Sequence, residues 1–273
     1  MKFWKLITFI PLILLAISVV FLFSNYMRTG EFIQRDIEFI GGKTITFQYT
    51  SIQNLQKIKS SLQDSTVKIT PNFIIVESSV NANETYIIDI VTANAQVNGQ
   101  PTIETIGPVL GAVFWQQAQM AIVVAFILMS IVVFILFRTF VPSMAVILSA
   151  LTDIVVTVMI IDLLGFKLSL ATLAGLLMLI GYSVDTDILL TTRLMKSHIS
   201  EIPKRIKSAM KTGLMTQGTT IAAAIALYIV IDNAVVQQIA AVIMIGILID
   251  ILSTWLCNAG ILRMYMERKE RIK

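Results

Sequence analysis

The chain has 273 residues, of which 56% are hydrophobic and 14% charged, with a formal net charge of +4 and a mean hydropathy of +0.82. Because an average soluble domain carries about a quarter charged residues, this composition excludes an ordinary soluble protein and predicts a membrane protein. The one cysteine, Cys257, excludes a disulfide framework and a cysteine metal cluster.

Six apolar runs are long enough to cross a hydrocarbon layer, which takes about 20 helical residues. The first follows Lys2 and Lys5, is longer than the apolar part of a signal peptide and lacks a small-x-small cleavage site, so we predict a retained helix. The predicted spans are 7–27, 120–137, 141–164, 168–190, 214–231 and 235–262.

The distribution of basic residues predicts the orientation of these spans. With alternate crossings, one side receives fourteen Lys and Arg residues in its termini and short loops, and the short links of the other side receive only Lys167. We therefore predict a multi-pass protein of the cell membrane with both termini cytoplasmic. The expected parts are a cytoplasmic N-terminus with the first span (1–27), an extracytoplasmic domain (28–118), five further spans with a cytoplasmic loop at 191–213 (119–262), and a basic tail (263–273).

The outer segment is typical of a small α+β domain. Alternating, β-branched runs predict strands at 43–49, 73–76 and 85–91. Ser51 is the expected cap of a helix through Leu55, Ile58 and Leu62, and a helix at about 103–118 leads into the second span. The predicted fold class is thus a polytopic α-helical membrane protein with six spans and a small α+β extracytoplasmic domain.

Four carboxylates inside the predicted spans are the candidate functional residues. A charged residue at the centre of a bilayer costs about 2.5–3.5 kcal/mol, and such residues are functional candidates by default. Asp185 and Asp187 lie about 200° apart around one helix, so only one of them is expected to face Asp153. The candidates for an ion or proton pathway are Asp153, Asp185, Asp187 and Asp250.

Uncharged polar residues in the fifth and sixth spans form, together with these carboxylates, a polar layer through four of the predicted helices. For the threonines and Asn258, hydrogen bonding that holds helices together is the simpler interpretation. For Asp153 and Asp185 a functional role is the favoured interpretation, because a Ser or Asn would hold helices together at a lower free-energy cost of insertion into the membrane. These uncharged residues are Thr216, Gln217, Thr219, Thr220, Ser253, Thr254 and Asn258.

Two further features are given structural interpretations. His198, in the basic loop, is interpreted as an ordinary solvated residue. Small residues in the fourth span predict close helix contacts; these are Ala171, Ala174, Gly175 and Gly181.

Three stretches resemble motifs of the SecD/SecF family, in the same order and over essentially the whole chain. Residues 36–43 resemble the DFxGG segment that follows the first helix, and 106–111 resemble the VGPxxG element before the second. Residues 181–187, with a later arginine, resemble the GYS signature of the fourth helix in the SecF members. The matching residues are Gly41, Gly42, Gly107, Pro108, Gly111, Gly181, Tyr182, Ser183 and Arg193.

The resemblance implies a SecF-type fold that is half of a resistance-nodulation-division transporter. It also implies partnership with SecD at the Sec translocation channel, with translocating preproteins as clients, and use of a proton or sodium gradient to move the outer domains. Asp153 matches the aspartate of the family's third helix. The family's proton-linked aspartate of the fourth helix aligns with Thr186, and the arginine of the fifth aligns with Thr212 beside Lys211. These departures and the short outer domain are more similar to archaeal than to bacterial members.

Two other functions are weighed against protein export. An intramembrane aspartyl protease uses a Tyr-Asp and a Gly-x-Gly-Asp pair, whereas Asp153 follows Thr152 and Asp185 follows Ser183-Val184 here, so no enzymatic activity is expected. The second alternative is a stand-alone small-solute exporter. Six spans form half of the usual transporter, so such an exporter needs a homodimer or another partner.

The sequence has no phosphate-binding loop, and no cofactor or metal is predicted. The basic 191–213 loop is interpreted as a positive-inside loop at the membrane lipid, and no nucleic acid partner is expected.

Overall fold

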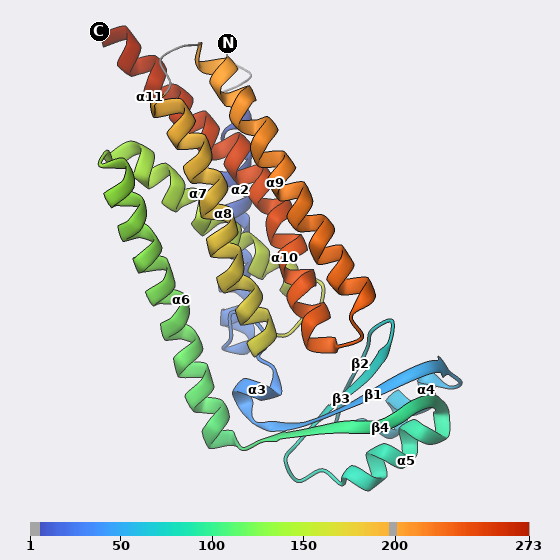
Figure 1. The fold of residues 1–273 in the computed structure, drawn as a ribbon. Helices are drawn as coiled ribbons and strands as arrows, with labels where there is room; N and C mark the ends of the chain where they lie inside the picture. The colour runs from blue at the N-terminus through green and yellow to red at the C-terminus, as the bar shows by residue number, and fades with distance from the viewer. Residues whose placement is uncertain (1–5, 197–200, 273) are drawn as a thin grey trace. The chain divides into compact units, whose positions relative to one another are not determined.

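A computed structural model of the chain describes residues 6–196 and 201–272 (Figure 1). The chain divides into two compact units. We call Met1–Gln34, Met120–Ile231 and Val235–Lys273 the membrane unit, and Arg35–Gln119 with Asp232–Ala234 the sheet domain. His198, expected to be a solvated loop residue, lies outside the described residues.

The described residues contain six helices long and apolar enough to cross a membrane, as the predicted fold class requires. The first five are α2 (Ile10–Thr29), α6 (Pro108–Phe137), α7 (Phe140–Leu163), α8 (Leu170–Lys196) and α9 (Ile202–Val230). The sixth is one long rod made of α10 (Ala234–Leu252), a π-helical segment η1 (Ser253–Asn258) and α11 (Ala259–Ile272) (Figure 1).

Most of the expected 191–213 loop is helical. Helix α8 continues to Lys196, and α9 begins at Ile202 rather than at residue 214. Pro203 in the first turn of α9 fits a helix start, since that turn has no partner for a backbone N–H. Ile202, Ile206 and Ala209 are buried, so this basic stretch is an amphipathic extension of the span.

Helix α7 lies at the centre of the membrane unit and packs against α2, α8 and η1. Glycines allow several close approaches between the helices. A Cβ on Gly175 of α8 would lie 2.9 Å from Val242, and one on Gly246 of α10 would lie 2.4 Å from Leu179, so neither position has room for a side chain. Gly181, in contrast, has no neighbouring atom within 4 Å, so its expected close contact is not made within this chain.

The sheet domain is a four-stranded antiparallel sheet in the order β2-β3-β1-β4. The strands are β1 (Gly42–Ile52), β2 (Thr66–Ile69), β3 (Phe73–Ser78) and β4 (Ala95–Ile106), and α3 (Ile37–Ile40) precedes them. Helices α4 (Leu55–Ser61) and α5 (Glu84–Asn94) bury apolar residues together with β1 and β3. This core consists of Ile45, Phe47, Ile58, Leu62, Ile74, Val76, Ile87, Val91 and Ala95.

Three local predictions for this domain were wrong. The predicted strand at 85–91 is helix α5, because the Asn83 side chain caps its start and helical spacing buries Ile87 and Val91 against the sheet. The predicted helix start at 103 is the end of strand β4. The cap of α4 is Asn54, which accepts a hydrogen bond from the Lys57 N–H, whereas Ser51 lies in β1.

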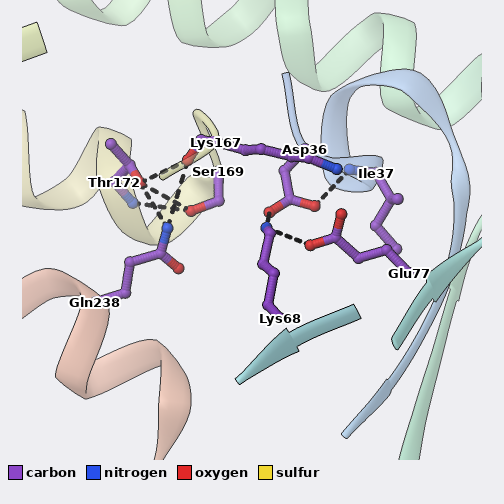
Figure 2. A network of polar contacts seen from close by, with 8 residues as sticks. All are labelled: Asp36, Ile37, Lys68, Glu77, Lys167, Ser169, Thr172 and Gln238. Carbon is purple, nitrogen blue, oxygen red and sulfur yellow. Dashed lines mark hydrogen bonds and ion pairs between the residues drawn. The ribbon is translucent and has the colours of Figure 1, made fainter. Parts of the chain in front are cut away.

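Figure 2 shows one polar network in each unit. In the sheet domain, the Lys68 ammonium is 3.3 Å from Asp36 Oδ2 and also pairs with Glu77, while Asp36 Oδ1 accepts a hydrogen bond of 2.6 Å from the Ile37 N–H. In the membrane unit, Ser169 accepts the Thr172 N–H at 3.1 Å, and Gln238 of α10 donates to the Thr172 hydroxyl at 2.8 Å. These contacts fix the start of α3 and the start of α8, respectively.

Candidate functional site

Three of the four predicted carboxylates meet inside the membrane unit. Asp153 of α7 and Asp187 of α8 are fully buried, and Asp250 of α10 is 1% exposed. Asp185 is exposed on the other side of α8 and makes no contact with them. The expectation that only one of the pair on α8 faces Asp153 therefore resolves to Asp187. We call Asp153, Asp187 and Asp250 the carboxylate cluster.

Two serines bind Asp153. The Ser183 hydroxyl of α8 lies 2.5 Å from Asp153 Oδ2, and the Ser253 hydroxyl of η1 contacts Asp153 Oδ1. The Ser253 oxygen is also 3.2 Å from the backbone carbonyl of Asp250. Asp153 thus connects three of the six spans.

Asp187 and Asp250 are joined by Thr254 of η1. Its hydroxyl oxygen lies 2.9 Å from Asp187 Oδ1 and 2.8 Å from Asp250 Oδ1. The Asn258 amide donates to Asp187 Oδ1 at 2.6 Å, and the Gln217 amide of α9 donates to Asp250 Oδ2 at 2.6 Å.

The π-helical segment brings these neutral donors together. A π-turn holds an extra residue compared with an α-turn and is frequent at functional sites. In η1, Ser253, Thr254 and Asn258 all bind cluster carboxylates. Sequence reasoning found these residues but interpreted Thr254 and Asn258 as groups that only hold helices together. Nothing in the local sequence indicates the π-turn itself.

The threonines of the fifth span lie elsewhere. The hydroxyl of Thr216 bonds to the carbonyl of Thr212 at 3.2 Å, and those of Thr219 and Thr220 bond to the Thr216 carbonyl at 2.8 and 3.0 Å. Thr186, which aligns with the family's aspartate, bonds to the Tyr182 carbonyl of its own helix at 3.4 Å. These hydroxyls therefore satisfy their own helices and do not hold neighbouring helices together.

The hydrogen bonds of the cluster limit how many of its carboxyls can be charged. Among the described residues, no Lys, Arg or His side chain bonds to Asp153, Asp187 or Asp250. A hydroxyl has one proton, so Thr254 can donate to only one of the two carboxyls that it contacts. A proton on the other carboxyl would complete the second bond. Because burying unpaired charges is expensive, the arrangement suits carboxyls that hold and exchange protons.

The glycine motifs of the sheet domain contact one another. Gly41 has φ +84°, and a Cβ there would lie 2.6 Å from the Pro108 Cα. A Cβ on Gly111 would lie 2.9 Å from the Gly41 nitrogen, so the first turn of α6 packs directly on the end of α3. Phe39 and Trp115 extend this contact, with ring centroids 5.5 Å apart. The two motifs, more than sixty residues apart in the sequence, therefore form one structural unit.

The other matched motif residues have separate places. A Cβ on Gly42 would lie 2.8 Å from the Ser78 carbonyl of β3, whereas Gly107 has open space around it. Tyr182 is 44% exposed on the side of α8 that carries Asp185. Arg193 donates to the Ser208 hydroxyl at 2.7 Å and to its carbonyl at 3.2 Å, which joins the end of α8 to the beginning of α9.

Residues 87–268 match the family model described as "Protein export membrane protein SecD/SecF, C-terminal". The protein-export membrane protein SecF of Pyrococcus furiosus is 37% identical over 272 residues, which cover 95% of this chain and 90% of the relative. That of Methanocaldococcus jannaschii is 36% identical over 279 residues, covering 97% and 96%. Among solved structures, SecDF of Thermus thermophilus, a translocon-associated membrane protein, superposes with a TM-score of 0.78 at 20% identity. The match covers 97% of this chain and 38% of that one, and it shows the fold.

Proposed function

The chain belongs to the SecF family of protein-export membrane proteins, and we propose that it works with a SecD protein at the Sec channel to move preproteins across the cell membrane. We propose further that proton transfer through the carboxylate cluster powers this work, and that both termini are cytoplasmic. The observation that carries the mechanism is a set of three buried carboxyls whose hydrogen-bond donors are all neutral.

Proton transfer changes the bonds that hold the spans together. When Asp153 loses a proton, it can only accept hydrogen bonds, so Ser183 and Ser253 must both turn their protons toward it. Ser253 then no longer donates to the Asp250 carbonyl, which lies 3.2 Å away. The protonation state of one carboxyl thereby favours one arrangement of α7, α8 and η1 over another, which is the kind of two-state element that a gradient can bias.

The available energy is adequate for such a bias. One proton that crosses a potential of 100 mV releases about 2.3 kcal/mol, enough to shift a two-state equilibrium by about fiftyfold. Helix α6 runs without interruption from the motif contact at Pro108 to Phe137 in the second span. We propose that this helix carries the movement between the spans and the sheet domain.

We propose a proton as the coupled ion because of the way in which the cluster carboxyls share donors. Asp187 and Asp250 both contact the Thr254 hydroxyl, and a proton on one carboxyl would complete the hydrogen bond that the single hydroxyl proton leaves open.

One face of α8 supports the SecD partnership. Met178, Gly181, Tyr182 and Asp185 follow helical spacing, and all four are exposed in this chain. A carboxylate on an exposed face of a span is expensive unless a partner covers it. We propose that a span of SecD packs on this face.

The mechanism is tested by proton flux in vesicles that contain this chain and its SecD partner. We expect Asp153→Asn to abolish flux that depends on the imposed gradient and to reduce preprotein export. Asp162→Asn is the matched control, because Asp162 is on the same helix but binds Asn25, at 2.7 Å, outside the cluster. Unchanged flux in Asp153→Asn would remove Asp153 from the pathway.

A further inference from the structure

A pocket of about 380 Å³ opens in the membrane unit beside Ile7 and Thr8, which precede α2, and beside the first turns of α9. Its far side is formed by η1 and the start of α11. The start of α2 and the end of α11 lie at this end of the membrane unit (Figure 1). Pockets that bind small molecules start at about 300 Å³, so the volume is sufficient for part of an amphiphilic molecule.

The pocket combines an apolar surface with two cations. Ile206, Met210 and Trp255 contribute apolar surface, and Lys207 and Arg263 are the charged residues among those that line it. The Arg263 Nε is 2.8 Å from Glu267 Oε1. Lys207 is exposed, and the described residues provide it with no hydrogen bond or ion pair. No carboxylate lines the pocket, so its electrostatics favour an anionic group attached to an apolar chain.

One wall of the pocket is connected to the carboxylate cluster. The Trp255 indole N–H donates to Gln217 Oε1 at 3.0 Å, and Gln217 donates to Asp250 at 2.6 Å. A Cβ on Gly213 would lie 2.4 Å from the Trp255 ring, so the ring packs tightly on α9. Trp255 therefore contacts both the pocket and, through one residue, the cluster, which makes it a natural reporter of occupancy.

We propose that this pocket binds an anionic phospholipid, with the phosphate between Lys207 and Arg263 and an acyl chain against Ile206, Met210 and Trp255. A free phosphate would gain nothing from the apolar walls, and a zwitterionic lipid would gain less from the two cations. The site thus selects an anionic lipid from the leaflet at the end of the membrane unit where α9 begins and α11 ends. This inference does not depend on the export function.

The test uses fluorescence quenching by lipids with brominated acyl chains. The full chain with Trp4→Phe and Trp115→Phe retains Trp255 as its one tryptophan and is reconstituted in phosphatidylcholine vesicles. Equal fractions of brominated phosphatidylglycerol or brominated phosphatidylcholine are then compared. We expect the anionic lipid to quench Trp255 at a lower fraction, and each cation that is removed to weaken this preference by about fivefold.

The variants separate the pocket from general surface charge. The double change Lys207→Gln and Arg263→Gln should abolish the preference, whereas Lys204→Gln with Lys211→Gln removes the same charge from exposed positions of α9 outside the pocket and should leave it intact. Lys207→Gln alone, at an exposed residue, covers the case that the Arg263 change disturbs folding. Three results would overturn the proposal. They are equal quenching by both lipids, an unchanged preference in the pocket variants, and no quenching of Trp255 by either lipid, which would mean that protein side chains fill the pocket.

Discussion

Asp187 and Asp250 lie on different spans and share a single hydroxyl, that of Thr254, at 2.9 and 2.8 Å. This shared hydroxyl joins α8 to the sixth span within the carboxylate cluster. It makes the protonation of one carboxyl depend on that of the other.

Thr254→Val keeps the shape of the side chain but removes the shared hydroxyl. Because two buried carboxyl oxygens lose a partner, we expect the free energy of unfolding to fall by about 1–3 kcal/mol. Thr254→Ser retains the hydroxyl and should lose much less. Thermal unfolding of the detergent-solubilised variants measures the difference, and a loss for Ser as large as that for Val would contradict a dominant contribution of the shared hydroxyl.

Asp187→Asn should reduce gradient-driven proton flux, because Asp187 belongs to the cluster, where it accepts from Thr254 and Asn258. Asp162→Asn serves again as the control on charge removal. Flux through SecD-containing vesicles is measured with an internal pH indicator. A normal rate in Asp187→Asn would restrict the pathway to Asp153 and Asp250.

Gly41→Ala should destabilise the sheet domain more than Gly99→Ala does. Both glycines have positive φ, +84° and +74°, so both variants carry backbone strain. Only at Gly41 does the new Cβ meet backbone, that of Pro108 at 2.6 Å, which should add about 1–3 kcal/mol. Proteolytic sensitivity of the domain in the full chain measures this difference, and equal sensitivity would mean that the motif contact contributes nothing beyond φ.

Lys68→Met should destabilise the sheet domain by about 3 kcal/mol, because it removes a cation that pairs with Asp36 and with Glu77, whose side chain is only 3% exposed. Lys43→Met is the matched control. Its partner Glu84 is 41% exposed and 2.6 Å away, so water replaces the lost contact and the loss should stay below about 1 kcal/mol. Urea unfolding followed by a probe in the domain compares the two variants; similar losses would contradict the distinction between buried and exposed pairs.

Gly181→Trp should prevent co-purification with SecD while the chain itself still folds, because the space around Gly181 is open in this chain. Gly218→Trp is the control, since this glycine of α9 also has no neighbour within 4 Å. Intact pairing in Gly181→Trp would place the SecD contact away from the exposed face of α8.

The local sequence was sufficient for the features that depend on composition over about twenty residues. Six spans follow from apolar length alone, and all three cluster carboxylates were found because a charged residue inside such a run is rare. The motifs at Gly41 and Pro108 were also recognised, although their mutual contact was not.

The tertiary structure decided the features that depend on which neighbour a residue meets. Residues 85–91 contain enough β-branched side chains to predict a strand. They are helical because Ile87 and Val91, one helical turn apart, both pack on the sheet. Whether Asp185 or Asp187 joined the cluster depended on the rotation of α8 in the bundle, which no run of residues in α8 specifies. The π-turn at Ser253–Asn258 is likewise stabilised by bonds to carboxyls from α7 and α8, so its cause lies outside its own sequence.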